Sequence, residues 1–414
     1  MRVVQVNKYH FAKGGADRYY LDLSAALARR GCTVTHLSMR HARNAPAGPD
    51  DRFVEEVDYR GRMGPGAKLR HALRVVYNRE AAAAARRIAE RERPAVAHVH
   101  SIYHQLSPSV IGAFARRGVP IVQTLHDYKL ICPAYLFLTG SGCICERCRG
   151  GKFHQAVRHR CLLAARWPSL VGAAEAYIHR WLRTHDAVRY FLCPSRFMLE
   201  KMASFGIERA RLLHLPYFIP LERYRPAEGA PERAAVYVGR LSREKGIPTL
   251  IRAMALLPAG RLKLWVLGEG PLGDELRALV RETCPDRVEL LGYRAGEALF
   301  DTIRRAAFAV VPSEWYENLP YAVLETFALG RPVVGARIGG IPELVEEGAN
   351  GSLHVSGDAR SLADALLRMT RPGADLVAMG AAARRKIERE FGEAAHLERL
   401  FEIYRDAGAT LSGC

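Results

Sequence analysis

Two glutamates, Glu317 and Glu325, are separated by seven residues and follow closely on the apolar run "FAVVPS". The run predicts a buried strand, and Pro320 predicts the first turn of a helix, where proline is favoured. Glu317 is then expected in the loop and Glu325 about a turn and a half into the helix. Acids so placed can address a sugar and a ribose at the two ends of one ligand. The N-terminus of a helix suits a phosphate, which would then lie between the two acids. The residues at this helix start are therefore further candidates for binding the ligand; they are Asn318, Leu319, Pro320 and Tyr321.

A pair of cations follows another predicted strand. In "VYVGRLSREKGIPTL", Arg240 and Lys245 stand at the exit of the strand with glycines beside them. Two fixed cations there can neutralise a diphosphate and the charge that develops as it leaves. A pair of solvated surface cations is the alternative. Gly268, in "VLGEGP" after the next strand, indicates a tight turn that could also contact a base or ribose; the stretch is not a complete GxGxxG fingerprint, and we do not interpret it as an NAD site.

Near the N-terminus, Gly14 and Gly15 separate the first predicted strand from the first predicted helix. Glycines in this position let the backbone approach a ligand, and the free N–H groups of the helix start suit a phosphate or a carboxylate. A plain loop explains a double glycine equally well.

Short apolar strands alternate with helical segments in both halves of the chain. This alternation predicts parallel sheets covered by helices on both faces. We therefore predict an α/β protein with two Rossmann-like, doubly wound domains facing a cleft, because ligands of open α/β sheets bind beyond the carboxyl ends of the strands. The predicted domains are residues 1–215 and 233–391, joined by a polar, proline-containing linker at 216–232.

Taken together, these motifs resemble one protein family. "ENLPYAVLE" resembles the E-x7-E motif of the retaining glycosyltransferases of family 4, which have the two-domain GT-B fold. The stretches "GG", "TLHD", "VGRLSREKG", "LGEGP" and "GGIPELVEEGANG" stand in the order of that family, so the resemblance covers nearly the whole chain. It implies that a C-terminal helix at about residues 392–414 packs back onto the first domain.

The resemblance implies how a donor is bound. Arg240 and Lys245 match the pair that holds the donor diphosphate. Glu317 matches the acid beside the hydroxyls of the transferred sugar, and the backbone after it contacts that sugar and the phosphate. Glu325 matches the ribose ligand. Donors of the family are usually UDP-, GDP- or ADP-sugars, of which we favour UDP-sugars, and no metal is obligatory; we expect no cofactor in catalysis.

Two residues of the first half also match the pattern of the family. Gly15 matches a loop glycine near the donor phosphate, and His126 matches a cleft histidine that contacts the sugar or the reacting centre. A purely structural, hydrogen-bonding histidine is the alternative. With both glutamates assigned to binding, no carboxylate nucleophile remains, so we expect a same-face displacement in which the leaving phosphate helps to deprotonate the acceptor. The residues expected to act in catalysis are His126, Arg240, Lys245 and Glu317.

Five cysteines lie in a predicted insertion at residues 127–165. Two of them have the C-x2-C spacing, and with two more they could form a tetrahedral thiolate site that pins the insertion around a structural zinc. An iron–sulfur cluster and free thiols are the alternatives. The expected zinc ligands are Cys132, Cys145, Cys148 and Cys161, which leaves Cys143 over.

The basic charge is concentrated in the first half of the chain. Residues 1–200 hold 32 Lys and Arg against 15 Asp and Glu, whereas residues 201–414 hold 29 against 28. A one-sided excess indicates an anionic partner, such as a lipid surface or a phosphate-bearing substrate. Nucleic acid is not expected, because no aromatic-interleaved basic motif is present. The stretches "HALRVVYNREAAAAARRIAERER" and "LVGAAEAYIHRWLRTH" are typical of interfacial helices, although such stripes more often face a core.

The N-terminal "MRVVQVNKYH" has charge where a signal peptide would be apolar, and no apolar stretch is long enough to cross a bilayer. We expect a cytoplasmic protein with peripheral contact at the inner face of the cell membrane. The sequence as a whole predicts a retaining hexosyltransferase that uses a nucleotide-diphosphate sugar and a glycan or lipid-linked acceptor, in cell-surface polysaccharide or glycolipid biosynthesis. A GT-B nucleotide-sugar epimerase and a non-catalytic nucleotide-sugar-binding subunit are the alternatives.

Overall fold

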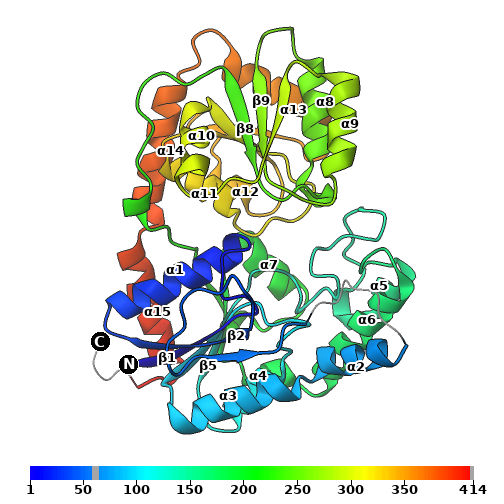
Figure 1. Ribbon diagram of the computed structural model, residues 1–414, viewed down its shortest axis with the longest axis vertical. Coiled ribbons are helices and arrows are strands. Elements are labelled where there is room, and N and C mark those ends of the chain that lie inside the picture. The colour runs from blue at the N-terminus through cyan, green and yellow to red at the C-terminus, as the bar shows by residue number, and fades with distance from the viewer. Residues whose placement is uncertain (58–64, 411–414) are drawn as a thin grey trace. The chain divides into compact units, whose positions relative to one another are not determined.

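The computed structural model describes residues 1–57 and 65–410, which divide into two compact units (Figure 1). The first unit contains residues 1–217 and the C-terminal residues from Glu393, and the second unit contains Phe218–Gly392. The chain therefore leaves the first unit, builds the second and returns. The boundary between the units lies inside the predicted linker 216–232, and two residues of that stretch, Phe218 and Tyr224, are buried side chains of the second unit.

The first unit is built on a parallel sheet with the strand order β3-β2-β1-β4-β5-β6-β7. The central strand β1 pairs with β2 on one side and β4 on the other, and the strands β4 and β5 are buried along their whole length. Such strands need apolar cover on both faces, which the helices provide. The strands are β1 (Arg2–Val6), β2 (Thr33–Met39), β3 (Arg52–Val54), β4 (Val96–Val99), β5 (Ile121–Thr124), β6 (Tyr190–Cys193) and β7 (Leu212–His214).

The helices of the first unit include one from the far end of the chain. Helix α15 lies beside α1 in Figure 1, and an ion pair between Arg29 and Glu393 at 2.6 Å joins the two. The helices are α1 (Gly15–Arg29), α2 (Pro65–Val76), α3 (Arg79–Arg91), α4 (Ser109–Ala115), α5 (His154–Arg158), α6 (Arg166–Trp181), α7 (Arg196–Ser204) and α15 (Glu393–Asp406).

The second unit repeats this plan with the strand order β10-β9-β8-β11-β12-β13, again all parallel. Helices α8, α9 and α13 pack together, and α11 packs with α14. The strands are β8 (Ala234–Val238), β9 (Lys263–Leu267), β10 (Val288–Gly292), β11 (Phe308–Val311), β12 (Val333–Ala336) and β13 (Gly351–His354). The helices are α8 (Ile247–Leu256), α9 (Gly273–Thr283), α10 (Glu297–Arg305), α11 (Tyr321–Ala328), α12 (Ile341–Leu344), α13 (Ala359–Thr370) and α14 (Leu376–Glu390).

The prediction of two Rossmann-like parallel α/β sheets is confirmed. In each sheet the chain starts at a central strand and proceeds outward on both sides, so the loops that diverge lie at one carboxyl edge. Among the residues that the structure describes, no helix combines the length and the apolarity that a membrane crossing requires.

Candidate functional site

The carboxyl edge of the second sheet carries most of the residues singled out in the sequence. Strands β8 and β11 are neighbours, but β8 is followed in the chain by β9 on one side and β11 by β12 on the other. The loops that leave β8 and β11 therefore diverge, which is the position where open α/β sheets bind ligands. Arg240 and Lys245 lie in the first of these loops and Glu317 in the second.

An ion pair joins the two loops. The Nζ of Lys245 lies 2.7 Å from Oε1 of Glu317, and the hydroxyl of Ser313 donates to the same oxygen at 2.7 Å. The glutamate side chain is 6% exposed and the lysine side chain 27% exposed. The lysine ammonium also lies 5.2 Å from the ring centre of Trp315, so a cation–π contact adds to the pair. The ammonium is thus fixed at the sheet edge.

Two glycines let the loops approach this closely. Gly246 has φ of 69°, and a Cβ there would lie 1.9 Å from the carbonyl oxygen of Pro312. Gly339, in the loop after β12, has φ of 59°, and a Cβ there would lie 2.2 Å from the carbonyl oxygen of Glu317. That oxygen accepts a hydrogen bond from the N–H of Gly340 at 2.8 Å. The backbone around Glu317 is therefore held from both neighbouring loops.

Arg240 differs from Lys245 in having no side-chain partner. Its side chain is exposed, and its guanidinium makes no hydrogen bond or ion pair with another described residue. The turn that carries it is held by Tyr237, whose buried hydroxyl donates to the carbonyl oxygen of Arg240 at 2.9 Å. Gly268 lies against this turn, because a Cβ there would meet the carbonyl oxygen of Gly239 at 1.9 Å. Gly268 is thus explained by packing between loops, and a ligand contact is not needed to account for it.

Helix α11 positions the second acid. Pro320 caps the helix at φ of −68°, and since proline has no N–H, the backbone donors of this turn come from its neighbours. Asn318, Leu319 and Tyr321 are all buried. Glu325 is buried one helical turn further on, and its Oε1 accepts from the hydroxyl of Tyr224 at 3.0 Å. The two acids of the motif thus have different partners, a cation for one and a phenol for the other.

In the first unit, the double glycine lies where the sequence places it. Gly14 caps α1 with an extended backbone, Gly15 is the first residue of the helix, and a Cβ added at Gly14 would meet no atom within 4 Å. The fold therefore does not require glycine at 14. In the first turn of α1, the buried carboxylate of Asp17 accepts from the side-chain amide of Asn7 at 2.9 Å. This bond ties the helix start to the carboxyl end of β1.

His126 follows β5 and has a partner on each ring nitrogen. Its Nε2 lies 3.0 Å from Nδ1 of His100, and its Nδ1 lies 2.7 Å from the hydroxyl of Tyr217. His100 Nε2 donates to the side-chain oxygen of Gln5 at 2.6 Å, so its Nδ1 is an acceptor. His126 must then donate through Nε2 and accept through Nδ1, and the Tyr217 hydroxyl must donate. His126 therefore presents a lone pair at Nδ1.

The histidine is also uncharged. Burial, with a further contribution from Lys8, lowers the pKa of His126 to about 3. Burial likewise lowers the pKa of His396, on α15, to about 4; this side chain donates through Nδ1 to the carbonyl oxygen of Pro216 at 2.8 Å and contacts Tyr19. A neutral His126 cannot act as an acid at neutral pH but can bind a hydroxyl group.

The four cysteines proposed as ligands lie in one neighbourhood. The Phe137 N–H bonds the thiol of Cys132, and its carbonyl accepts from the N–H of Cys145 at 2.7 Å. Ala156 is near the other two, because its backbone influences the pKa of Cys148 and its carbonyl accepts from the Cys161 N–H at 3.0 Å. Burial raises the pKa of Cys148 to about 12, and the charges of the other three thiols act in the same direction. Cys143 is exposed instead.

A second group with metal-ligating chemistry was not found from the sequence. The ligand atoms of His10, His36 and Asp51 all lie within 4.8 Å of one another. Asp51 already accepts from the backbone and Nδ1 of His36 at 2.7 and 3.0 Å, and His10 lies 2.9 Å from the hydroxyl of Tyr20. These bonds join β2 to the start of β3 and explain the group as packing.

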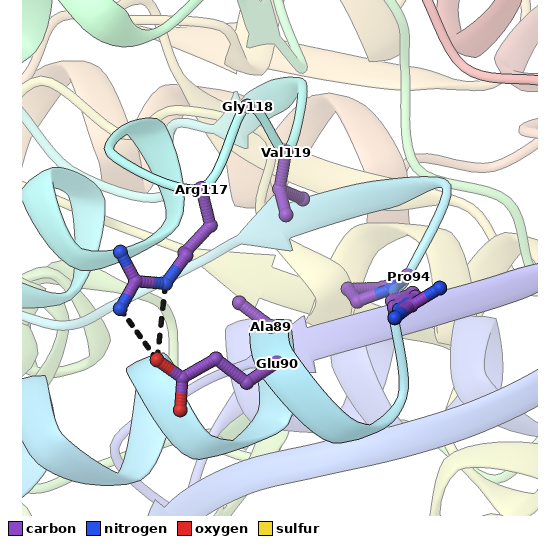
Figure 2. A pocket seen from close by; sticks show the side chains of 7 residues that line it. Ala89, Glu90, Pro94, Arg117, Gly118 and Val119 are labelled. Atoms are coloured by element: carbon purple, nitrogen blue, oxygen red, sulfur yellow. Dashed lines mark hydrogen bonds and ion pairs between the residues drawn. The ribbon is translucent and has the colours of Figure 1, made fainter.

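The hollow drawn in Figure 2 lies away from these residues. It has a volume of about 440 Å³ and is lined by residues before β4 and β5, among them Pro94 and Val119. An ion pair between Arg117 and Glu90 at 2.5 Å crosses it. Because this is the amino edge of the sheet, opposite to His126 and Gly15, we assign it no role in the site.

The structure brings together the residues of the second unit, namely Arg240, Lys245, Gly268, Glu317 to Tyr321 and Glu325, and it places Gly15 and His126 in the first unit. Sequence reasoning missed the partners that hold them. Ser313 is a local partner, because it lies four residues before Glu317 in the same loop. Tyr237 lies three residues before Arg240. The partners that are far apart in the chain, and gave no signal, are Tyr224, His100 and Tyr217.

Known proteins match both units of the chain. Residues 13–223, half of the chain, match the family "Glycosyltransferase Family 4", and residues 232–371 match "Glycosyl transferases group 1". The amylovoran biosynthesis glycosyltransferase AmsK of Erwinia amylovora is 34% identical over 174 residues, which cover 40% of this chain and 43% of AmsK. The chain spans about half the length of the curated relatives it matches.

Solved structures match over nearly all of the chain. Sucrose-phosphate synthase from Thermosynechococcus elongatus has a TM-score of 0.73 at 20% identity and covers 98% of both chains. Anabaena HepE in complex with UDP has a TM-score of 0.68 at 15% identity and covers 98% of this chain and 100% of its own. The structural likeness shows the GT-B fold, and at these identities it shows the fold alone.

Proposed function

Because the chain belongs to glycosyltransferase family 4, we propose that it moves a hexose from a nucleotide-diphosphate sugar to a glycan or lipid-linked acceptor with retention of configuration. The observation that carries this proposal is the ion pair at the carboxyl edge of the second sheet, where Lys245 and Glu317 join two diverging loops. A structural surface pair would not need two tight glycines and a buried acid.

The donor diphosphate is proposed to lie between Arg240 and Lys245. Arg240 supplies an exposed guanidinium that has no partner among the described residues, and Lys245 supplies an ammonium that its pairing with Glu317 holds in place. Fixed cations stabilise the charge of a leaving diphosphate without reorganising, so the proposal requires no metal in catalysis. Glu325 is proposed to bind the ribose, and the backbone from Asn318 to Tyr321, Gly15 and Gly268 to lie along the donor.

The proposed mechanism is a displacement on one face of the sugar. Glu317 is poorly suited to be a nucleophile, because its Oε1 already accepts hydrogen bonds from Lys245 and Ser313. We assign it to the hydroxyls of the transferred sugar. The leaving phosphate is then the base that takes the proton of the acceptor hydroxyl as the new bond forms.

His126 is proposed to accept a hydrogen bond from a sugar hydroxyl through Nδ1. Its neutral state and its tautomer support this role, since the ring keeps a lone pair at that nitrogen. The hydroxyl of Tyr217 occupies this position in the structure and would have to give way.

Two comparisons support finer choices of substrate. HepE, which shares the fold, also has a structure in complex with UDP-glucose, which favours a UDP-sugar here over GDP- or ADP-sugars. AmsK is named for amylovoran biosynthesis, which favours a polysaccharide or lipid-linked acceptor at the cell surface. The proposal places the protein in the cytoplasm at the inner face of the membrane.

The test begins with a thermal-shift screen of UDP-, GDP- and ADP-sugars, because a bound donor raises the apparent stability by mass action. The preferred donor is then offered with glycan and lipid-linked acceptors, and the anomeric configuration of the product is read by NMR. Donor binding with no transfer or hydrolysis would favour the binding subunit, and exchange of sugar epimers would favour the epimerase.

We also propose a structural zinc on Cys132, Cys145, Cys148 and Cys161. The charges of the other three thiols raise the pKa of Cys148, and the backbone N–H group directed at Cys132 is a donor of the kind that zinc-bound thiolates commonly accept. Protein purified without chelator should hold about one zinc per chain. Cys148→Ser should lose it, whereas Cys143→Ser, two residues from a ligand but exposed, should keep it. A folded, metal-free parent protein would remove the proposal.

A further inference from the structure

The outward face of α6 is apolar. Four large side chains on it are exposed, with exposed fractions of 50% for Trp167, 48% for Leu170, 40% for Tyr177 and 81% for Trp181. With Ala174 their spacing is three or four residues throughout, so they form one stripe along the helix. The stripe faces solvent, which corrects the expectation that it faces the core.

The inward face of the same helix carries three polar side chains beside two small residues, Gly172 and Ala173. Glu175 is buried and pairs with buried Lys129 at 2.6 Å, and the His179 ring lies 3.1 Å from the hydroxyl of Thr184. Ser169 is buried and donates to the carbonyl of the helix cap at 2.7 Å. Surface helices of globular proteins usually have the opposite arrangement, with apolar residues inward. Packing among the described residues explains Tyr177, whose ring lies 5.2 Å from that of Phe153, but leaves Trp167, Leu170 and Trp181 exposed.

The apolar surface continues beyond the helix. Leu163 before α6 and Leu182 after it are exposed, as are Leu73 and Tyr77 at the end of α2, which packs against α6. These four and the four of the stripe make eight of the fourteen exposed large hydrophobic side chains of the described residues. Single exposed apolar residues are ordinary, but such a concentration marks a binding surface.

Basic side chains border the stripe. Arg166 precedes Trp167, Arg180 precedes Trp181, and Arg183 follows Leu182, all exposed. The only acid of α6 is the buried Glu175. Tryptophan flanked by arginine suits the boundary between headgroups and acyl chains, where the ring is half buried and the guanidinium meets phosphate. A second copy of this chain would bring like charges together.

We propose that this surface, made of α6 with Leu163, Leu182 and the end of α2, docks the protein on a bilayer that contains anionic lipid. Trp167 and Trp181 insert at the level of the headgroups, and Arg166 and Arg180 pair with lipid phosphate, whereas Arg183 is ion-paired with Asp186. The proposal does not depend on sugar transfer, because none of these side chains belongs to the donor site.

Tryptophan fluorescence tests this directly. The chain has four tryptophans, and the other two, Trp265 and Trp315, are buried in the second unit. Vesicles of phosphatidylcholine with phosphatidylglycerol should therefore shift the emission of the full chain to the blue, and brominated lipid should quench it. Vesicles of phosphatidylcholine alone should bind much more weakly, and added salt should weaken binding to the anionic vesicles.

The decisive variant is Trp167→Ala with Trp181→Ala, which should weaken co-sedimentation with anionic vesicles by about a hundredfold. Tyr293→Ala is the matched control, because it removes an exposed aromatic ring, 66% exposed, from the second unit. Thermal melting and the donor-induced thermal shift should be unchanged in both variants. Undiminished vesicle binding by the double variant, binding without a blue shift, or a lipid-free dimer that the double variant abolishes would each overturn the proposal.

Discussion

Replacing Lys245 with methionine should destabilise the second unit by a predictable amount. The ammonium lies 2.7 Å from a glutamate that is 6% exposed, and the lysine itself is 27% exposed. Removing one partner of a buried pair costs about 3 to 5 kcal/mol, whereas an exposed pair contributes about 1 kcal/mol or less. The pair lies between these cases, and Ser313 still donates to the carboxylate. We expect a loss of about 2 kcal/mol in the free energy of unfolding.

The loss of turnover should be much larger than this loss of stability explains. A fixed group that stabilises developing charge contributes about 10² to 10³ in rate. Adding Glu317→Gln to Lys245→Met removes the uncompensated charge and keeps an oxygen that Ser313 can bind. The double variant should therefore regain stability but not turnover, which separates the two roles of the lysine.

Urea unfolding and initial rates at saturating donor measure the two effects. Lys263→Met is the matched control, because that lysine is exposed in the same unit and lies 3.9 Å from Glu289. It should change neither quantity. Turnover by Lys245→Met within about threefold of the parent would refute the leaving-group role. A double variant no more stable than Lys245→Met would refute the argument from the buried carboxylate.

Two further predictions follow from the backbone and from the histidines. Gly339→Ala should lower the affinity for the donor about tenfold, as measured from the donor-induced thermal shift, because a Cβ there would lie 2.2 Å from a backbone oxygen of the neighbouring loop. Gly292→Ala is the control. Gly292 has φ of 70° and open space around it, so this variant should add only backbone strain and leave the thermal shift intact. Below pH 6.5 the first unit should lose stability before the second, because burial lowers the pKa of His126 to about 3 and of His396 to about 4, and the unfolded chain then binds protons that the folded unit does not. Each such histidine lowers the free energy of unfolding by about 2 kcal/mol at pH 5. The second unit holds one of the fifteen histidines, so its stability should change less. Hydrogen exchange that rises equally in both units as the pH falls would contradict the prediction.

The fold and the location of the site could be predicted because both depend on local patterns. Strand exits are recognisable from apolar runs, and parallel topology brings their carboxyl ends to one edge, so Arg240, Lys245 and Glu317 could be assigned to one edge without coordinates. The burial of Phe218 and Tyr224 could not be predicted, for the complementary reason. The proline and polar residues of the predicted linker are a local signal, whereas that burial depends on contacts with distant residues.

The partners of the site residues could not be predicted because they come from distant parts of the chain. Tyr224 and Glu325 are 101 residues apart, and His126 bonds to residues 26 and 91 positions away. These contacts determine chemistry that the residue type leaves open. From the sequence alone, His126 could be a cation or a neutral ring in either tautomer. Burial determines that it is neutral. The Gln5 oxygen determines its tautomer, because it fixes which nitrogen of His100 donates.

Helix α6 illustrates the same limit for a surface. Its periodicity divides the helix into an apolar and a polar face, and the usual inference places the apolar face inward. The polar face is inward here because Lys129 offers a buried counter-charge to Glu175. Lys129 lies three residues before Cys132, within the cysteine-containing insertion. The orientation of the helix therefore depends on how that insertion folds. The hydrophobic pattern of α6 alone cannot predict this orientation.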